Sequence, residues 1–301
     1  MGRFAPSPTG DLHLGSLLAA TASFLDARAH GGRWLVRMED VDRSREVPGA
    51  AAGILQTLEA FGFEWDGEVV RQSERSEYYT AAIEKLRARG LTFECSCSRR
   101  DLAGHERYPG YCRGGPRNMH AATATRLRIE PRPVTFSDRI QGNQTQDVAS
   151  VAGDVILRRR DGFFAYLLAV VIDDAAQGVT HVVRGADLLD DTPRQIYLQQ
   201  SLALPTPQYA HVPVLLEADG SKLAKSARSV SLRESSPQVQ LIRVLQILEL
   251  APPDLLEGAP IRQLWAWAQA HWALNRLRER PDSRLQGQSR SDTPPGKPRL
   301  P

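Results

Sequence analysis

The sequence predicts an α/β protein in which a parallel sheet is covered by helices, interrupted by an insertion and followed by a short helical region. Three observations indicate this fold class. Helix and strand patterns alternate over residues 1–90, as they do in parallel sheets. The alternation stops in the next segment, which contains every cysteine, and then returns. Beyond residue 233 the pattern is purely helical.

The first elements follow the order of a helix-covered parallel sheet. Helical periodicity predicts helices over residues 17–29, 50–61 and 76–89, and residues 34–36 are typical of a short buried strand. A glycine follows each of these helices, which is the usual signal for a helix end. Ser76 is the expected N-cap of the third helix.

Over residues 91–162 the alternating helix and strand patterns give way to turns and strand-like runs. This stretch contains a turn-forming Tyr-Pro-Gly at residues 108–110 and a strand-like run at residues 125–129. After it, residues 180–184 are expected to form a strand, and Thr192 with Pro193 is expected to open a helix. This order of elements indicates one parallel sheet whose two halves are separated in the chain by an inserted segment.

The chain is therefore divided into five parts. The helical part is expected to contain one helix that starts at Ser236 and Pro237 and another within residues 260–274, and the tail has too few apolar residues to fold. The five parts are the first half of the sheet domain (1–90), an inserted domain with the cysteines (91–162), the second half of the sheet domain (163–233), a helical region (234–280) and a disordered tail (281–301).

Composition excludes some classes of protein. The 301-residue chain has a net charge of +3, which is too small to indicate a nucleic-acid partner, and a basic stretch at residues 276–301 is assigned no role. The longest apolar run, residues 165–172, is too short to cross a bilayer. The chain begins directly with a candidate motif, so we expect no signal peptide and a cytoplasmic protein without membrane contact.

Residues 2–16, GRFAPSPTGDLHLGS, form the most informative segment. Pro6 and Pro8 stiffen an extended stretch, and His13 and Gly15 precede the first expected helix. The first N–H groups of a helix lack partners and lie at the positive end of its dipole, so this junction suits an anion. By itself, the segment is equally compatible with a proline-rich arm that caps a helix.

A second segment, residues 220–226, reads GSKLAKS. Lys222 and Lys225 lie three apart among small residues, so their ammonium groups could close on phosphates and stabilise a leaving pyrophosphate. The alternative is an ordinary solvated turn.

Together the two segments resemble the signatures of class I aminoacyl-tRNA synthetases. His13-Leu14-Gly15-Ser16 resembles their HIGH motif, and residues 222–226 resemble their KMSKS loop. Ser16 departs from the second histidine of HIGH, and Ala224 from a serine of KMSKS, but both lysines are present. Four further blocks are similar to the glutamyl branch of this family: residues 3–10, 37–42, 169–174 and 183–189.

The resemblance, which covers residues 3–233, implies that residues 1–90 and 163–233 form a class I, Rossmann-type catalytic domain. It also implies that residues 91–162 form an inserted acceptor-type domain and residues 234–280 a stem-contact-like helical region. The implied activity is ATP-dependent activation of L-glutamate, with Mg²⁺ accompanying ATP. His13, Lys222 and Lys225 are the implied catalytic residues. The implied ATP-binding set is His13, Gly15, Ser16, Lys222 and Lys225. Arginines suit carboxylates, and a glutamate side chain suits an ammonium group. The implied glutamate-binding set is Arg3, Phe4, Ala5, Pro6, Ser7, Glu39, Tyr166 and Arg184.

Cys95, Cys97 and Cys112 are crowded enough to favour a metal over disulfides. Structural zinc takes four ligands and prefers thiolates, so one more ligand is needed. Ligand chemistry alone nominates His105, whereas the resemblance implies Tyr108, four residues before the last cysteine. We expect one structural zinc ion and leave these two alternatives open.

Because the helical region after residue 233 is short, we expect no anticodon-binding domain. In this respect the chain resembles the truncated paralogues of glutamyl-tRNA synthetase. These paralogues activate glutamate without tRNA and transfer it to queuosine in the anticodon loop of tRNA(Asp), and we expect a monomer. The alternatives are a minimal glutamyl-tRNA synthetase that charges a tRNA 3′ end, an unrelated nucleotidyltransferase, and a non-catalytic tRNA-binding paralogue.

Overall fold

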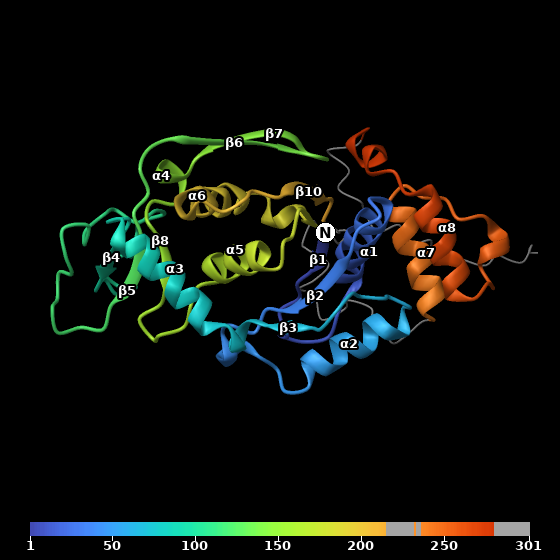
Figure 1. The fold of residues 1–301 in the computed structure, drawn as a ribbon, viewed down its shortest axis with the longest axis horizontal. Coiled ribbons are helices and arrows are strands. Elements are labelled where there is room, and N and C mark those ends of the chain that lie inside the picture. Colours follow the sequence, from blue (N-terminus) through green and yellow to red (C-terminus); the bar gives the residue numbers. More distant parts are fainter. Residues whose placement is uncertain (215–231, 233–235, 280–301) are drawn as a thin grey trace, which may run out of the picture.

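The computed structural model describes residues 1–214, Leu232 and residues 236–279, and Figure 1 shows the resulting elongated molecule. The strands are β1 (Gly2–Phe4), β2 (Trp34–Met38), β3 (Val70–Arg71), β4 (Thr92–Cys95), β5 (Ala124–Leu127), β6 (Pro133–Asp138), β7 (Gly142–Asp147), β8 (Val155–Arg158), β9 (His181–Gly185) and β10 (Gln208–Val212). The α-helices are α1 (Leu14–Ala29), α2 (Ala50–Ala60), α3 (Ser76–Ala88), α4 (Val148–Val151), α5 (Tyr166–Ala176), α6 (Thr192–Leu202), α7 (Pro237–Ile247) and α8 (Ile261–His271). Short 3₁₀ helices are η1 (Arg43–Arg45), η2 (Gln72–Glu74), η3 (Ala186–Leu188), η4 (Asp254–Leu256) and η5 (Leu274–Glu279).

Parallel strands form the centre of the molecule. β1, β2 and β3 pair in parallel, and β9, β10 and β6 form a second parallel set that the antiparallel strand β7 extends. The carbonyl of Met1 accepts hydrogen bonds from the N–H groups of Thr180 and His181, which join the start of β1 to the start of β9. The carboxyl ends of these parallel strands therefore share one edge, where α/β proteins usually bind ligands.

Residues 91–162 contribute to two different sheets. β4, β5 and β8 form a separate antiparallel sheet at one end of the molecule (Figure 1). The β6–β7 hairpin instead lies beside β10 in the central sheet. Within residues 91–162 the pairing is antiparallel except where β6 pairs in parallel with β10.

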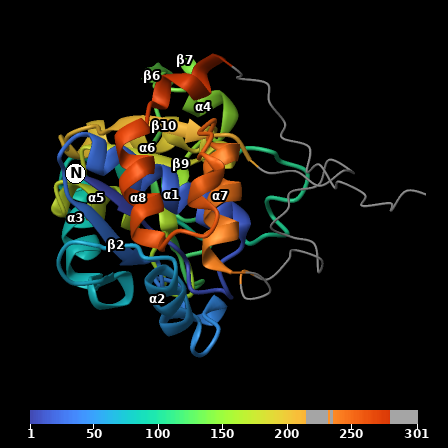
Figure 2. The ribbon, with the colours of Figure 1, turned by 90° about the vertical axis from the view of Figure 1, so that its right-hand side faces the viewer.

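The two helices of residues 236–279 cover the outer face of α1 (Figures 1 and 2). The rings of Phe24 in α1 and Trp265 in α8 have centroids 4.8 Å apart, and Trp265 Nε1 donates to the carbonyl of Phe61 at 2.9 Å. Buried aromatic and aliphatic side chains from both parts form one continuous core. This packing holds α1, and hence the segment that precedes it, against the sheet.

Several expected boundaries need correction. The first helix begins three residues earlier than expected, at Leu14, because His13 caps it. The expected N-cap at Ser76 is wrong, since Ser76 is the first helical residue and Arg75 occupies the cap. The helix expected to open at Thr192 and Pro193 does begin at Thr192. The expected lysine loop and tail lie outside the described residues. Among the described residues, every helix is too short or too polar to cross a membrane.

Candidate active site

A cavity of about 520 Å³ opens where β1, β9 and β10 end. The described residues of both implied substrate sets, apart from Glu39, line it: Arg3, Phe4, Ala5, Pro6, Ser7, His13, Gly15, Ser16, Tyr166 and Arg184. Glu39 borders a second cavity of about 620 Å³, and both cavities share Ala5, Ser7 and Tyr166 in their walls. The topology therefore brings together side chains that lie up to 181 positions apart in the chain.

His13 is held over the start of α1. Its Nδ1 accepts a hydrogen bond from the Ser16 N–H at 3.2 Å, so a neutral ring carries its proton on Nε2. Burial lowers the pKa of His13, although the charge of Asp187 opposes this effect. A Cβ at Gly15 would lie 3.1 Å from the imidazole, which explains a residue without a side chain at this position. His13 is thus a neutral hydrogen-bond donor at a helix N-terminus.

Arg184, at the end of β9, is 4% exposed. Its Nη2 donates to Thr192 Oγ1 at 2.8 Å, and its Nε donates to His211 Nε2 at 3.0 Å. Its Nη1 is buried and has no hydrogen-bond partner among the described residues. A buried cation with an unused donor beside a cavity is suited to an anionic ligand.

A second group of buried charges surrounds Arg3. Asp174 of α5 accepts from Arg3 Nε at 3.3 Å and from Arg37 Nη2 at 2.8 Å. Burial raises the pKa of Asp174, but the two guanidinium groups hold it below its ordinary value. Arg37 also lies 3.4 Å from Glu39. Asp174 therefore fixes Arg3 while it balances two positive charges.

Glu39 differs from Asp174 because burial is the larger effect there. Burial raises the pKa of Glu39 to about 7, although the charges of Arg37 and Arg3 oppose it. Tyr166, the first residue of α5, also has a raised pKa because it is buried and because Glu39 is nearby. Tyr166 lies in the wall shared by the two cavities, and the second cavity is also lined by a carboxyl group that titrates near neutrality.

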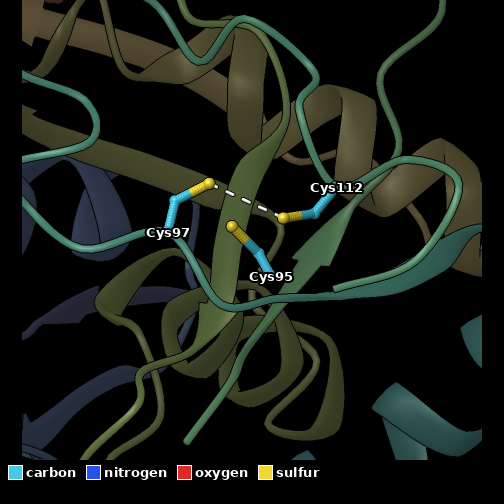
Figure 3. A group of neighbouring side chains, drawn as sticks. All are labelled: Cys95, Cys97 and Cys112. Atoms are coloured by element: carbon cyan, nitrogen blue, oxygen red, sulfur yellow. Dashed lines mark hydrogen bonds between the residues drawn. The ribbon is translucent and has the colours of Figure 1, made fainter. Parts of the chain in front are cut away.

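The three cysteines converge at the end of β4, as Figure 3 shows. Their sulfur atoms lie within 4.8 Å of one another, and Cys97 Sγ is 3.6 Å from Cys112 Sγ. The hydroxyl of Tyr108 lies 3.3 Å from Cys95 Sγ, whereas His105 is hydrogen-bonded to Tyr111. The cluster therefore contains Tyr108 rather than His105.

The chemistry of this cluster fits a metal ion. Burial raises the pKa of Cys112, but hydrogen bonds, chiefly from the backbone of Arg117 and Ser96, lower it to about 6. One thiolate among three buried sulfur atoms attracts a cation, and thiolates are preferred ligands of zinc.

Sequence reasoning missed the residues that support the arginines. Asp174 appeared only as part of a similar block, although an acidic pair inside an apolar helix is a signal that it has a buried partner. His211 and Asp138 gave no comparable signal, because both lie in strands that the sequence did not predict. Lys222 and Lys225 lie outside the described residues, so their position relative to the cavity stays a prediction.

Known proteins identify the fold and the family. The family model "tRNA synthetases class I (E and Q), catalytic domain" matches residues 1–245, so the parallel sheet and its cavity form a class I synthetase catalytic fold. The chain is 54% identical to a glutamyl-Q tRNA(Asp) synthetase of Ectopseudomonas mendocina, across 92% of this chain and 94% of that protein. A glutamyl-Q tRNA(Asp) synthetase of Thiobacillus denitrificans is 51% identical, across 93% of this chain and 96% of that protein. The chain belongs to the glutamyl-Q tRNA(Asp) synthetase family.

Solved structures of longer enzymes share the fold. The glutamate-tRNA synthetase of Elizabethkingia anophelis matches with a TM-score of 0.77 and 25% identity, over 91% of this chain and 65% of that one. A glutamate tRNA ligase of Elizabethkingia meningosepticum, solved with its amino acid, matches with a TM-score of 0.76 and 25% identity, over 91% and 64%. The chain thus spans about two thirds of the length of these synthetases.

Proposed function

We propose that the protein activates L-glutamate with ATP in the absence of tRNA and then transfers the glutamate to queuosine in the anticodon loop of tRNA(Asp). The observation that carries this proposal is the convergence of Arg3, Arg184 and His13 on one cavity. The relatives that match nearly the whole chain are named glutamyl-Q tRNA(Asp) synthetases, which supports the same acceptor.

The two adjoining cavities together supply the charges that glutamate requires. Arg3 and Arg184 are assigned to the carboxylates of the substrate, because a guanidinium group binds a carboxylate through two parallel hydrogen bonds. Glu39 is assigned to the ammonium group, and the Tyr166 hydroxyl closes the pocket beside it. Phe4, Ala5, Pro6 and Ser7 line the same cavity as Arg3 and Arg184 and are assigned to the glutamate pocket with them.

Activation joins the glutamate carboxylate to ATP. A carboxylate oxygen attacks the α-phosphorus, the bond from that phosphorus to the bridging oxygen breaks, and pyrophosphate leaves. His13, Gly15 and Ser16 are assigned to the ATP phosphates at the start of α1. Lys222 and Lys225, which lie outside the described residues, are assigned to the leaving pyrophosphate, and Mg²⁺ accompanies ATP.

Transfer consumes the adenylate. A hydroxyl of the queuosine cyclopentene ring attacks the activated carbonyl, an ester forms, and AMP leaves with the bonding electron pair. The enzyme then contributes mainly by holding the two reactants together.

The cysteine cluster is proposed to hold one structural zinc ion through Cys95, Cys97, Cys112 and Tyr108. The ion would tie together the chain on both sides of residues 98–107 and would take no part in ATP chemistry.

We propose that residues 1–90 and 163–233 are the two halves of the catalytic domain and that residues 91–162 are the inserted domain, whose β6–β7 hairpin pairs with the central sheet. Residues 234–280 are assigned to a helical region and 281–301 to a tail. We also propose that the protein is a cytoplasmic monomer.

Two measurements test the proposed function. Glutamate-dependent exchange of labelled pyrophosphate into ATP is expected without any tRNA. Labelled glutamate is expected to enter tRNA(Asp) that carries queuosine and not the same tRNA without it. Exchange that requires tRNA(Glu) would instead indicate a minimal glutamyl-tRNA synthetase, and the absence of both activities would indicate a non-catalytic tRNA-binding paralogue.

A further inference from the structure

A buried chain of polar groups connects three strands behind the cavity. It runs from Asp138 at the end of β6 through His211 in β10 to Arg184 in β9. Asp138 Oδ2 lies 2.6 Å from His211 Nδ1, and His211 Nε2 lies 3.0 Å from Arg184 Nε. Asp138 and His211 are both fully buried. The sequence motifs and the proposed chemistry leave both residues without a role.

The hydrogen bonds determine where the imidazole proton lies. Arg184 Nε–H can only donate, so His211 Nε2 accepts and the proton resides on Nδ1, which donates to Asp138. Burial lowers the pKa of His211, although the bond to Asp138 opposes this effect, so the ring is neutral. A neutral ring is required here, since a protonated one would direct a second donor at Arg184.

Backbone groups hold the other end of the chain in place. Asp138 Oδ1 accepts from the N–H groups of Ile140 at 2.9 Å and Gln141 at 2.8 Å, and also from the N–H of His211 at 3.2 Å. The carboxylate therefore cannot rotate without breaking several hydrogen bonds. A fixed carboxylate fixes the ring, and the ring in turn fixes one edge of the Arg184 guanidinium.

The orientation of Arg184 follows from these contacts. Its Nε is bonded to His211 and its Nη2 to Thr192, so the unpartnered Nη1 is the donor left for a ligand. We propose that Asp138 and His211 are positioning residues that orient Arg184 to bind a carboxylate of the amino-acid substrate. This inference rests on the proposed function, because it requires Arg184 to bind glutamate.

Three variants distinguish an effect on the orientation of Arg184 from a general loss of folded protein. His211→Gln retains an oxygen that can accept from Arg184 Nε, whereas His211→Leu removes that acceptor. Asp138→Asn keeps the size of the side chain. Because the backbone N–H groups require an oxygen at Oδ1, its amide nitrogen would face His211 Nδ1 and force the ring proton onto Nε2. Two donors would then face each other at Arg184, as when the acid of a catalytic triad becomes an amide and selects the wrong tautomer.

The readout is steady-state kinetics of glutamate-dependent pyrophosphate exchange. His211→Leu and Asp138→Asn are expected to raise the KM for glutamate about ten- to hundred-fold, the usual effect of losing a charge-assisted hydrogen bond. The kcat and the KM for ATP are expected to change less than about threefold, and His211→Gln is expected to restore most of the glutamate affinity. Tyr209→Phe is the matched control, because it removes a buried hydroxyl from β10 that bonds only Gln199 among the described residues.

Three outcomes would contradict the inference or the proposed function. Loss of folded protein or of ATP affinity in His211→Leu and Asp138→Asn alike, without rescue by His211→Gln, would assign the pair a structural role and overturn the inference. An unchanged glutamate KM in folded Asp138→Asn would overturn it as well. If the wild-type protein shows no glutamate-dependent exchange, the proposed function fails and the inference fails with it, so the two failures are distinguishable.

Discussion

Glu39 is a carboxyl group whose charge depends on pH within the physiological range. Burial raises its pKa to about 7, while Arg37 and Arg3 oppose the rise. A neutral Glu39 cannot pair with an ammonium group, so the assigned role requires the ionised form. If Glu39 binds the ammonium group as proposed, its raised pKa is expected to make glutamate binding weaker in mild acid.

We predict that kcat/KM for glutamate falls about tenfold per pH unit below the Glu39 pKa of about 7. The sign follows from the requirement for the carboxylate, which is present above this pKa and lost below it. The measurement is pyrophosphate exchange from about pH 8 to about pH 5.5 with ATP saturating, a range that brackets the shifted group.

Glu39→Gln serves as the control for this pH profile. It is expected to have a much higher KM for glutamate, and its kcat/KM is expected to lose the inflection near neutrality. A wild-type profile that stays flat through this range would contradict the assignment of Glu39 to the ammonium group.

At the scale of elements, the cysteine segment depends on a neighbouring turn. Gly153 follows α4 with φ +66°, and a Cβ there would lie 2.5 Å from the carbonyl oxygen of Tyr108. The N–H of Tyr108 also donates to the carbonyl of Ala152 at 3.3 Å. The turn at residues 152–153 therefore supports the backbone that carries Tyr108.

We expect purified protein to contain about one equivalent of zinc, as a four-ligand structural site requires. Cys97→Ser and Tyr108→Phe are expected to retain less zinc, because each removes a ligand. His105→Ala is the control, since His105 is bonded to Tyr111 instead of the cluster. Metal analysis of the purified variants provides the measurement, and zinc loss only in His105→Ala would reverse the choice of fourth ligand.

Gly153→Ala is expected to weaken the same site through the backbone. A left-handed alanine costs about 1–2 kcal/mol by itself, and the contact with Tyr108 adds to that cost. Gly178→Ala is a matched control, because Gly178 has φ +67° and nothing within 4 Å of a Cβ. Thermal unfolding and zinc content should both be lower in Gly153→Ala than in Gly178→Ala. Equal effects would show that the turn does not support the segment.

At the scale of the whole molecule, two adjacent acids of α5 connect distant parts of the fold. Asp173 accepts from Gln72 and Tyr79, at 2.9 Å and 2.7 Å. Asp174 pairs instead with Arg3 of β1 and Arg37 of β2. The partners of both acids precede residue 91, whereas α5 follows residue 162. These contacts therefore join the two halves of the chain that residues 91–162 separate.

Asp174→Asn is expected to lower the free energy of unfolding by about 3–5 kcal/mol, because it leaves two buried arginines without their shared counterion. Asp191→Asn is the control, since its pair with Arg194 is partly exposed and worth less than about 1 kcal/mol. Urea unfolding measures both variants. A loss below about 1 kcal/mol for Asp174→Asn would mean that the buried pairs contribute little.

Much of the fold could be predicted from local signals. Four of the helices expected within residues 50–274 begin within one residue of the predicted start, because caps, prolines and apolar periodicity are encoded in neighbouring residues. β10 was missed because it is a buried five-residue strand without alternation, and the β6–β7 hairpin because it is short and largely polar. These strands are defined by their pairing with distant segments, which leaves little trace in the local sequence.

By itself, the sequence determined the family resemblance, the order of the helices and the side chains that we propose bind glutamate and ATP, since short motifs carry that chemistry directly. Only the tertiary structure decided how those side chains are held. Asp174 orients Arg3, His211 and Asp138 contact Arg184, and Tyr108 displaces His105 from the cysteine cluster. The physical reason is that a buried charge takes its orientation and its pKa from whichever groups the fold brings within about 3 Å, whatever their separation along the chain.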